Sequence, residues 1–64
     1  MSSFDFSAYF PGRLLRDIPD REFLDLMAKL AFPRALARER YALFCASDKR
    51  APDWTTFDFK FPKP

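Results

Sequence analysis

The sequence contains no histidine, and it has only one cysteine and one glycine. Without histidine, no Ser–His or Cys–His pair can form in which a base activates a nucleophile. Cys45 alone cannot make an internal disulfide or a thiolate zinc site. The single glycine, Gly12, excludes a glycine-rich phosphate-binding loop. We therefore expect a protein that is not an enzyme and that needs no metal or cofactor.

Valine is also absent, and isoleucine occurs once, at Ile18. Strands favour β-branched residues, so this composition argues against an extensive sheet. With 48% hydrophobic and 31% charged residues, the chain also differs from typical disordered sequences. These features predict a small all-α fold.

The chain has 64 residues and is expected to form a single small domain, 1–64, with a limited hydrophobic core. Disulfides and bound metals often supplement such a core, but the composition excludes both. Further stability must then come from helix packing, or from binding to a larger protein partner or to a second copy in a homo-oligomer.

The expected location is the cytoplasm. A lone cysteine suits a reducing compartment, and the first residues show no signal-peptide pattern. No stretch approaches the roughly 20 apolar residues that cross a bilayer, so we expect no interaction with a membrane.

Two helices are predicted, one on each side of Pro33. The first covers about residues 19–31, where Pro19 suits the first helical position and apolar residues recur at helical spacing. This apolar face consists of Phe23, Leu26, Met27 and Leu30. The second helix covers about residues 33–46, and Cys45 lies on its apolar side. Together they predict a two-helix hairpin.

The acidic residues of the first helix have a structural explanation. Asp20 and Glu22 lie in its first turn, where negative charge complements the helix dipole. Asp25 and Lys29, four residues apart, are expected to form an ion pair. Because Asp20 and Glu22 do not face one another on a helix, we expect no shared carboxylate site for acid–base catalysis or cation binding.

Both ends of the chain carry a Phe-Asp-Phe motif, at residues 4–6 and 57–59. Residues 1–12 and 51–64 are predicted to be extended aromatic arms that flank a helical core at 13–50. In an extended chain, every second side chain points to the same face. One stripe of the C-terminal arm would then contain Phe57, Phe59 and Phe61.

Two roles remain open for the arms. They can cover the helices or pair with each other as a minor two-stranded ribbon, in which Asp5 would face Lys60. Alternatively, an arm docks on another protein, since an alternating aromatic strand can add to the edge of a partner's sheet.

The two arms differ in their expected roles. The N-terminal arm is expected to complete the core through Phe4, Phe6 and Phe10. The C-terminal arm, which also contains Trp54, is expected to reach the partner. The candidate partner-binding residues are Trp54, Phe57, Phe59, Phe61, Phe4, Phe6, Tyr9 and Phe10.

A second candidate surface is basic. The net charge is +2, and five cationic residues lie on or just after the second predicted helix: Arg34, Arg38, Arg40, Lys49 and Arg50. Such a cluster can bind an acidic protein surface or a phosphate backbone. It can also be an ordinary solvated face, because Glu39 and Asp48 interrupt it.

The sequence thus favours a non-enzymatic protein–protein interaction module. It would be an accessory subunit, or a small inhibitor or modulator, that docks on a larger protein through its aromatic arms. The alternative is a small basic binder of nucleic acid or of an acidic surface that uses the arginine face of the second helix. Self-association through exchanged arms is a third arrangement.

Overall fold

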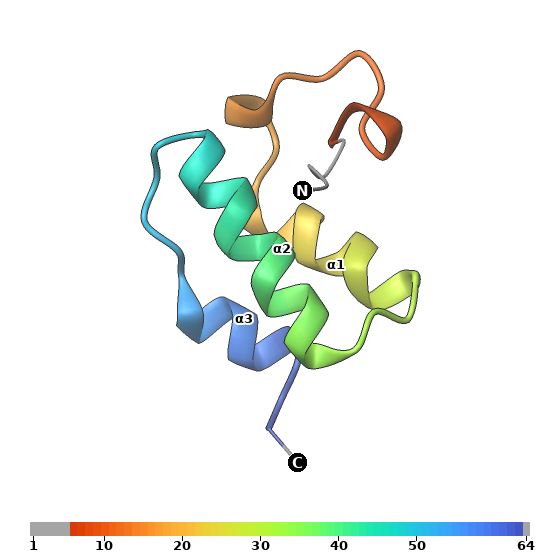
Figure 1. Cartoon of the computed structure of the whole chain (residues 1–64), viewed down its shortest axis with the longest axis vertical. Helices are drawn as coiled ribbons and strands as arrows, with labels where there is room; N and C mark the ends of the chain where they lie inside the picture. The colour runs from red at the N-terminus through yellow and green to blue at the C-terminus, as the bar shows by residue number, and fades with distance from the viewer. Residues whose placement is uncertain (1–5, 64) are drawn as a thin grey trace.

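The computed structural model describes residues 6–63 and contains three α-helices and two short 3-10 helices. In chain order, the elements are η1 (Phe6–Ala8), η2 (Leu15–Asp17), α1 (Asp20–Lys29), α2 (Arg34–Ser47) and α3 (Trp54–Lys60). The N-terminal segment and α3 lie on opposite sides of the α1–α2 pair (Figure 1). A small, mostly helical fold is confirmed. No strand occurs within residues 6–63, so the predicted ribbon is not formed there.

Both long helices begin directly after a proline. Pro19 and Pro33 are the N-cap residues, with extended ψ angles of 148° and 152°. The bounds of α1 and α2 therefore agree with the predicted 19–31 and 33–46 to within about two residues, the usual uncertainty of a helix end.

Each of these helices ends in a backbone reversal made without glycine. Ala31 and Lys49 adopt left-handed φ angles of 61° and 55°. The next amide in each case donates back to the last turn, from Phe32 N to Met27 O at 3.0 Å and from Arg50 N to Cys45 O at 2.9 Å. This geometry satisfies helix carbonyls that would otherwise lack a donor.

The core is built mainly of stacked aromatic rings. Phe23 of α1 lies against Phe44 of α2, with centroids 4.4 Å apart and planes 13° from parallel. Tyr41 of α2 stacks on Phe57 of α3 at 6.0 Å. All four side chains are fully buried, as is Cys45. Because these rings come from α1, α2 and α3, the cluster joins all three helices.

The prediction of an extended C-terminal arm is wrong, because residues 54–60 form helix α3. The side chain of Asp53 caps its start, accepting from the Thr56 amide at 3.2 Å and from the Thr56 hydroxyl at 2.8 Å. Phe57 and Phe61, four residues apart, lie on the same helix face and stack at 5.3 Å. Phe59 lies about 200° around the helix from Phe57. The three phenylalanines therefore do not form one stripe.

The N-terminal segment also departs from the predicted extended arm. Residues 6–8 form a 3-10 turn, and Gly12 adopts a φ of 75° that favours glycine. The rings of Phe6 and Phe10 lie 5.9 Å and 6.1 Å from that of Phe23, so these two residues complete the core as expected. The predicted core residue Phe4 and the proposed pairing of Asp5 lie outside the described residues.

Candidate functional site

The structure separates the candidate partner-binding aromatics into buried and exposed residues. Phe57, Phe61 and Phe10 belong to the core, with at most 8% of their surface exposed. Phe6 and Trp54 are partly buried and pack against the core. The exposed members within the described chain are Phe59, at 80%, and Tyr9, at 38%.

Phe59 stands over a recess between α1 and α3. This Phe59 recess has a volume of about 430 Å³ and is lined by Arg21, Thr55, Thr56, Phe59 and Lys60. The Lys60 ammonium lies 5.9 Å from the centroid of the Phe59 ring. An exposed aromatic side chain is thus surrounded by hydroxyl groups and positive charge.

Lys60 also fixes α3 to α1. Its ammonium pairs with the Asp25 carboxylate, so Asp25 pairs across helices and not with Lys29 as predicted. Sequence spacing alone favours the i, i+4 partner, but the docking of α3 brings Lys60 to Asp25. This ion pair anchors the helix turn that carries Phe59.

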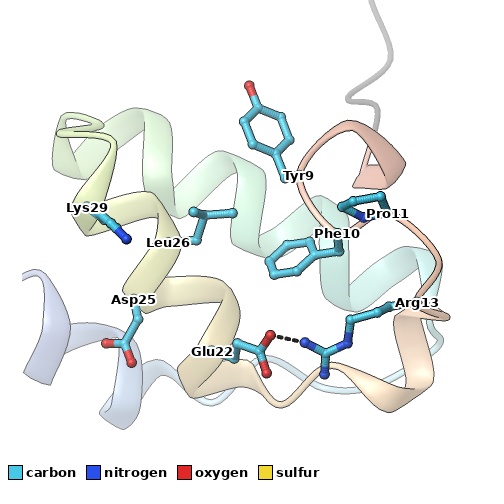
Figure 2. Close-up of a pocket in the computed structure, with 8 residues that line it drawn as sticks. All are labelled: Tyr9, Phe10, Pro11, Arg13, Glu22, Asp25, Leu26 and Lys29. Carbon is cyan, nitrogen blue, oxygen red and sulfur yellow. Dashed lines mark hydrogen bonds and ion pairs between the residues drawn. The ribbon is translucent and has the colours of Figure 1, made fainter.

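A second hollow lies between the N-terminal segment and α1 (Figure 2). This N-terminal pocket has a volume of about 370 Å³ and is lined by Tyr9, Phe10, Pro11, Arg13, Glu22, Asp25, Leu26 and Lys29. Phe10 and Leu26 contribute apolar surface, and the ion pair between Arg13 and Glu22 closes one end (Figure 2). Asp25 lines this pocket and pairs with Lys60 of the Phe59 recess, so one ion pair links the linings of the two hollows.

The five basic candidates do not form one surface. Arg34 and Arg38 are on the first turns of α2, whereas Lys49 and Arg50 follow its other end, about 20 Å away at the rise of an α-helix. Arg34 donates to Phe61 O at 2.8 Å and to Asp58 Oδ1 at 2.7 Å, which ties α2 to α3.

A basic groove lies between α2 and the C-terminal end of the chain. It has a volume of about 440 Å³ and is lined by Arg34, Arg38, Trp54, Asp58 and Lys63. The Arg38 guanidinium lies over the indole ring of Trp54, at 4.6 Å from its centroid. Sequence reasoning identified two of these cations but not Lys63, which is distant from them along the chain.

Arg50, in contrast, is part of a polar network inside the fold. Its guanidinium donates to Asp20 Oδ1 at 2.5 Å, to Asp48 Oδ2 at 2.7 Å, and to the carbonyls of Leu15 and Ile18 at 3.0 Å and 3.2 Å. We call Arg50, Asp20, Asp48 and Tyr41 the Arg50 network. Its role is structural, because it joins η2, α1 and the end of α2.

Tyr41 extends this network to α3. Its hydroxyl donates to Asp20 Oδ2 at 2.6 Å and accepts from the Asp53 amide at 2.7 Å, directly before α3. Burial, followed by the hydrogen bond to Asp20, raises the pKa of Tyr41 far above its usual value. Burial likewise raises the pKa of the Cys45 thiol, which disfavours the reactive thiolate.

Raising the pH above about 9 is therefore expected to destabilise the fold. Because Tyr41 and Cys45 have higher pKa values when folded, the unfolded chain releases their protons at lower pH. The stability that these groups contribute is complete below their unfolded pKa values and falls as the pH rises beyond them. Urea titrations at increasing pH should show a falling midpoint.

The control is Tyr41→Phe, whose ring cannot ionise. This variant should be less stable at neutral pH, because Asp20 and the Asp53 amide lose a partner. Its further loss in alkali should be smaller than that of the unmodified protein. An equal alkaline loss in both proteins would show that Tyr41 does not cause it.

Within residues 6–63, no three Asp, Glu or Cys side chains cluster closely enough to hold a metal ion. None of the helices in this part of the chain is long and apolar enough to cross a bilayer. Comparisons with protein-family models, with curated proteins and with solved structures each find no match.

Proposed function

We propose that this chain is a non-enzymatic interaction module that docks on a larger protein through Phe59. The observation that carries the proposal is the exposure of this side chain, 80% of which is open to solvent, whereas Phe57 in the same helix and Phe61 at its C-cap are buried. Aromatic residues contribute a large share of the energy of protein interfaces. Phe59 is accordingly the residue of the aromatic C-terminal segment that is best placed to contact a partner.

The anchoring of α3 favours this role. The Asp53 cap, the buried rings of Phe57 and Phe61, and the Lys60–Asp25 ion pair fix the helix at both ends. A side chain presented on a fixed helix loses less conformational freedom when it binds than one on a mobile tail. Docking by a preformed helix replaces the strand addition that an extended arm would have offered.

The surroundings of Phe59 indicate the chemistry of the partner surface. Arg21 and Lys60 give the Phe59 recess a positive rim, and Thr55 and Thr56 supply hydroxyl groups. The complementary surface is an apolar pocket with acidic residues at its edge. The chain would act there as an accessory subunit, or as a small inhibitor or modulator, and its lone cysteine favours a cytoplasmic setting.

Phe59→Ser is expected to weaken binding of the partner about 30-fold, corresponding to the loss of one interface hot spot. The full chain is purified natively, its mass is measured by light scattering, and the protein that copurifies is identified. The affinity of that purified protein is then measured for the unmodified chain and for Phe59→Ser.

The matched control is Leu14→Ser, which removes another apolar side chain that is 55% exposed but lies before η2. This variant should bind within about twofold of the unmodified chain, as expected for a surface position outside the interface. Equal affinity of Phe59→Ser and the unmodified chain would rule out docking through Phe59. A dimer that dissociates on Phe59→Ser would instead identify a second copy as the partner.

A further inference from the structure

We propose that the basic groove binds the carboxylate side chains of a short acidic segment in a partner protein. This site is separate from the docking surface described above, because the basic groove and the Phe59 recess share no residue. The occupant is an Asp- or Glu-containing peptide segment, and it is inferred from the charge and shape of the groove.

Positive charge is concentrated at the basic groove. The lining has three cationic side chains and one carboxylate, Asp58. The whole chain has 11 basic and 9 acidic residues. Outside the groove, eight basic and eight acidic residues therefore remain, and their charges cancel. The excess positive charge of the protein is therefore located at this groove.

Two of the three cationic side chains in the basic groove are available to bind a ligand. Arg34 is engaged by Phe61 O and Asp58. By contrast, neither Arg38 nor Lys63 forms an ion pair with a carboxylate of residues 6–63. The Arg38 guanidinium stacks on the Trp54 ring, with its Cζ 4.6 Å from the ring centroid. This stacking leaves the N–H groups at the edge of the guanidinium to bind a carboxylate.

The start of α2 adds to the attraction. Arg34 is its first residue, and Pro33 provides no side-chain cap. The first amides of a helix carry partial positive charge, which favours an anion nearby. This contribution has the same sign as that of the three cationic side chains.

The surroundings favour an acidic peptide over a nucleic acid. Arg38 occupies a face of the Trp54 ring, where a base would otherwise stack. The exposed Glu39 directly follows Arg38 in the sequence, and the exposed Asp53 directly precedes Trp54. These negative charges disfavour a continuous phosphate backbone more than a short segment with one or two carboxylates.

The test uses the full chain at low ionic strength, with a short fluorescein-labelled Glu/Ser peptide as the probe. Anisotropy of the label measures affinity, and the emission of Trp54, the single tryptophan of the chain, reports whether the groove is occupied. We expect saturable binding that shifts Trp54 emission and weakens as salt is added. A Lys/Ser peptide of the same length should not bind.

The double variant Arg38→Gln with Lys63→Gln is expected to weaken peptide binding about tenfold, as for the loss of two surface charge pairs. The control, Arg16→Gln with Lys49→Gln, removes the same charge from exposed positions outside the groove and should change affinity less than about twofold. Phe59→Ser should bind the peptide normally, so a failure here and a failure of Phe59 docking can be told apart.

Three results would overturn the proposal. The first is the absence of saturable peptide binding at low ionic strength. The second is an equal loss of affinity in the groove variant and the control, which would indicate attraction to net charge alone. The third is tighter binding of a single-stranded DNA oligonucleotide that is lost in the groove variant, which would make nucleic acid the ligand of this site.

Discussion

Phe57→Ala is expected to lower the free energy of unfolding by about 3–5 kcal/mol, the usual effect of removing a buried phenylalanine ring. Phe57 is fully buried, and its ring contacts those of Tyr41, Trp54 and Phe61 at centroid distances of 5.3–6.0 Å. A domain of this size has a total stability of about 3–10 kcal/mol. The variant should therefore be unfolded or close to unfolding at room temperature.

The matched control is Phe59→Ala, the same substitution two residues along α3. Because Phe59 is 80% exposed, this change should alter the free energy of unfolding by less than about 0.5 kcal/mol. Urea denaturation followed by circular dichroism measures both variants. Similar losses from the two substitutions would contradict the helical register of α3.

This contrast also determines how the docking surface must be tested. Changing Phe57, Phe59 and Phe61 together would abolish binding by unfolding the protein, whatever the role of Phe59. Only the single change at Phe59 separates the interface from the core.

Arg50→Met is expected to lower the free energy of unfolding by about 3 kcal/mol, because it leaves partly buried carboxylates without their cation. Asp20 and Asp48, the carboxylate partners of Arg50, each have only 21% of their side-chain surface exposed. The carbonyls of Leu15 and Ile18 also lose a donor. Thermal and urea unfolding at neutral pH measure the effect.

Lys49→Met provides the control, since Lys49 is the exposed neighbour of Arg50 and forms none of the ion pairs found in residues 6–63. Its stability should stay within about 0.5 kcal/mol of that of the unmodified protein. If Arg50→Met were equally mild, the Arg50 network would not be a stabilising element of the fold.

The sequence was sufficient to predict the two long helices. Pro19 and Pro33 determine where α1 and α2 begin. The apolar spacing identifies Phe23 and Met27 as buried, but Leu30, predicted on the same face, is the C-cap of α1 and is 44% exposed. The burial of Cys45 and the packing of Phe6 and Phe10 on the core were also predicted correctly. These features depend on local signals or on simple hydrophobicity.

Helix α3 was missed because its pattern is ambiguous. Phe57, Phe59 and Phe61 alternate as in a strand, while Phe57 and Phe61 alone have helical spacing. A helix of seven residues is marginal by itself and is stabilised by tertiary packing, which no local pattern reveals. The available signal was Asp53, an N-cap residue placed three positions before Thr56.

The roles of the charged residues depended on contacts between distant positions. Arg50 meets Asp20, which is 30 residues away, and Lys60 meets Asp25 in another helix. Sequence spacing gives ion pairs only within a helix. The sequence therefore could not distinguish the structural Arg50 from Arg38, which lines the basic groove.

The C-terminal aromatic segment forms a helix docked on the core, which leaves Phe59 as its exposed phenylalanine. Amide hydrogen exchange measured by NMR distinguishes a docked helix from a free arm. The Phe57 amide donates to Asp53 O at 3.1 Å and the Phe61 amide to Phe57 O at 2.8 Å. Both amides should exchange far more slowly than in a free peptide of residues 51–64. Exchange at the free-peptide rate would show instead that this segment is an undocked arm.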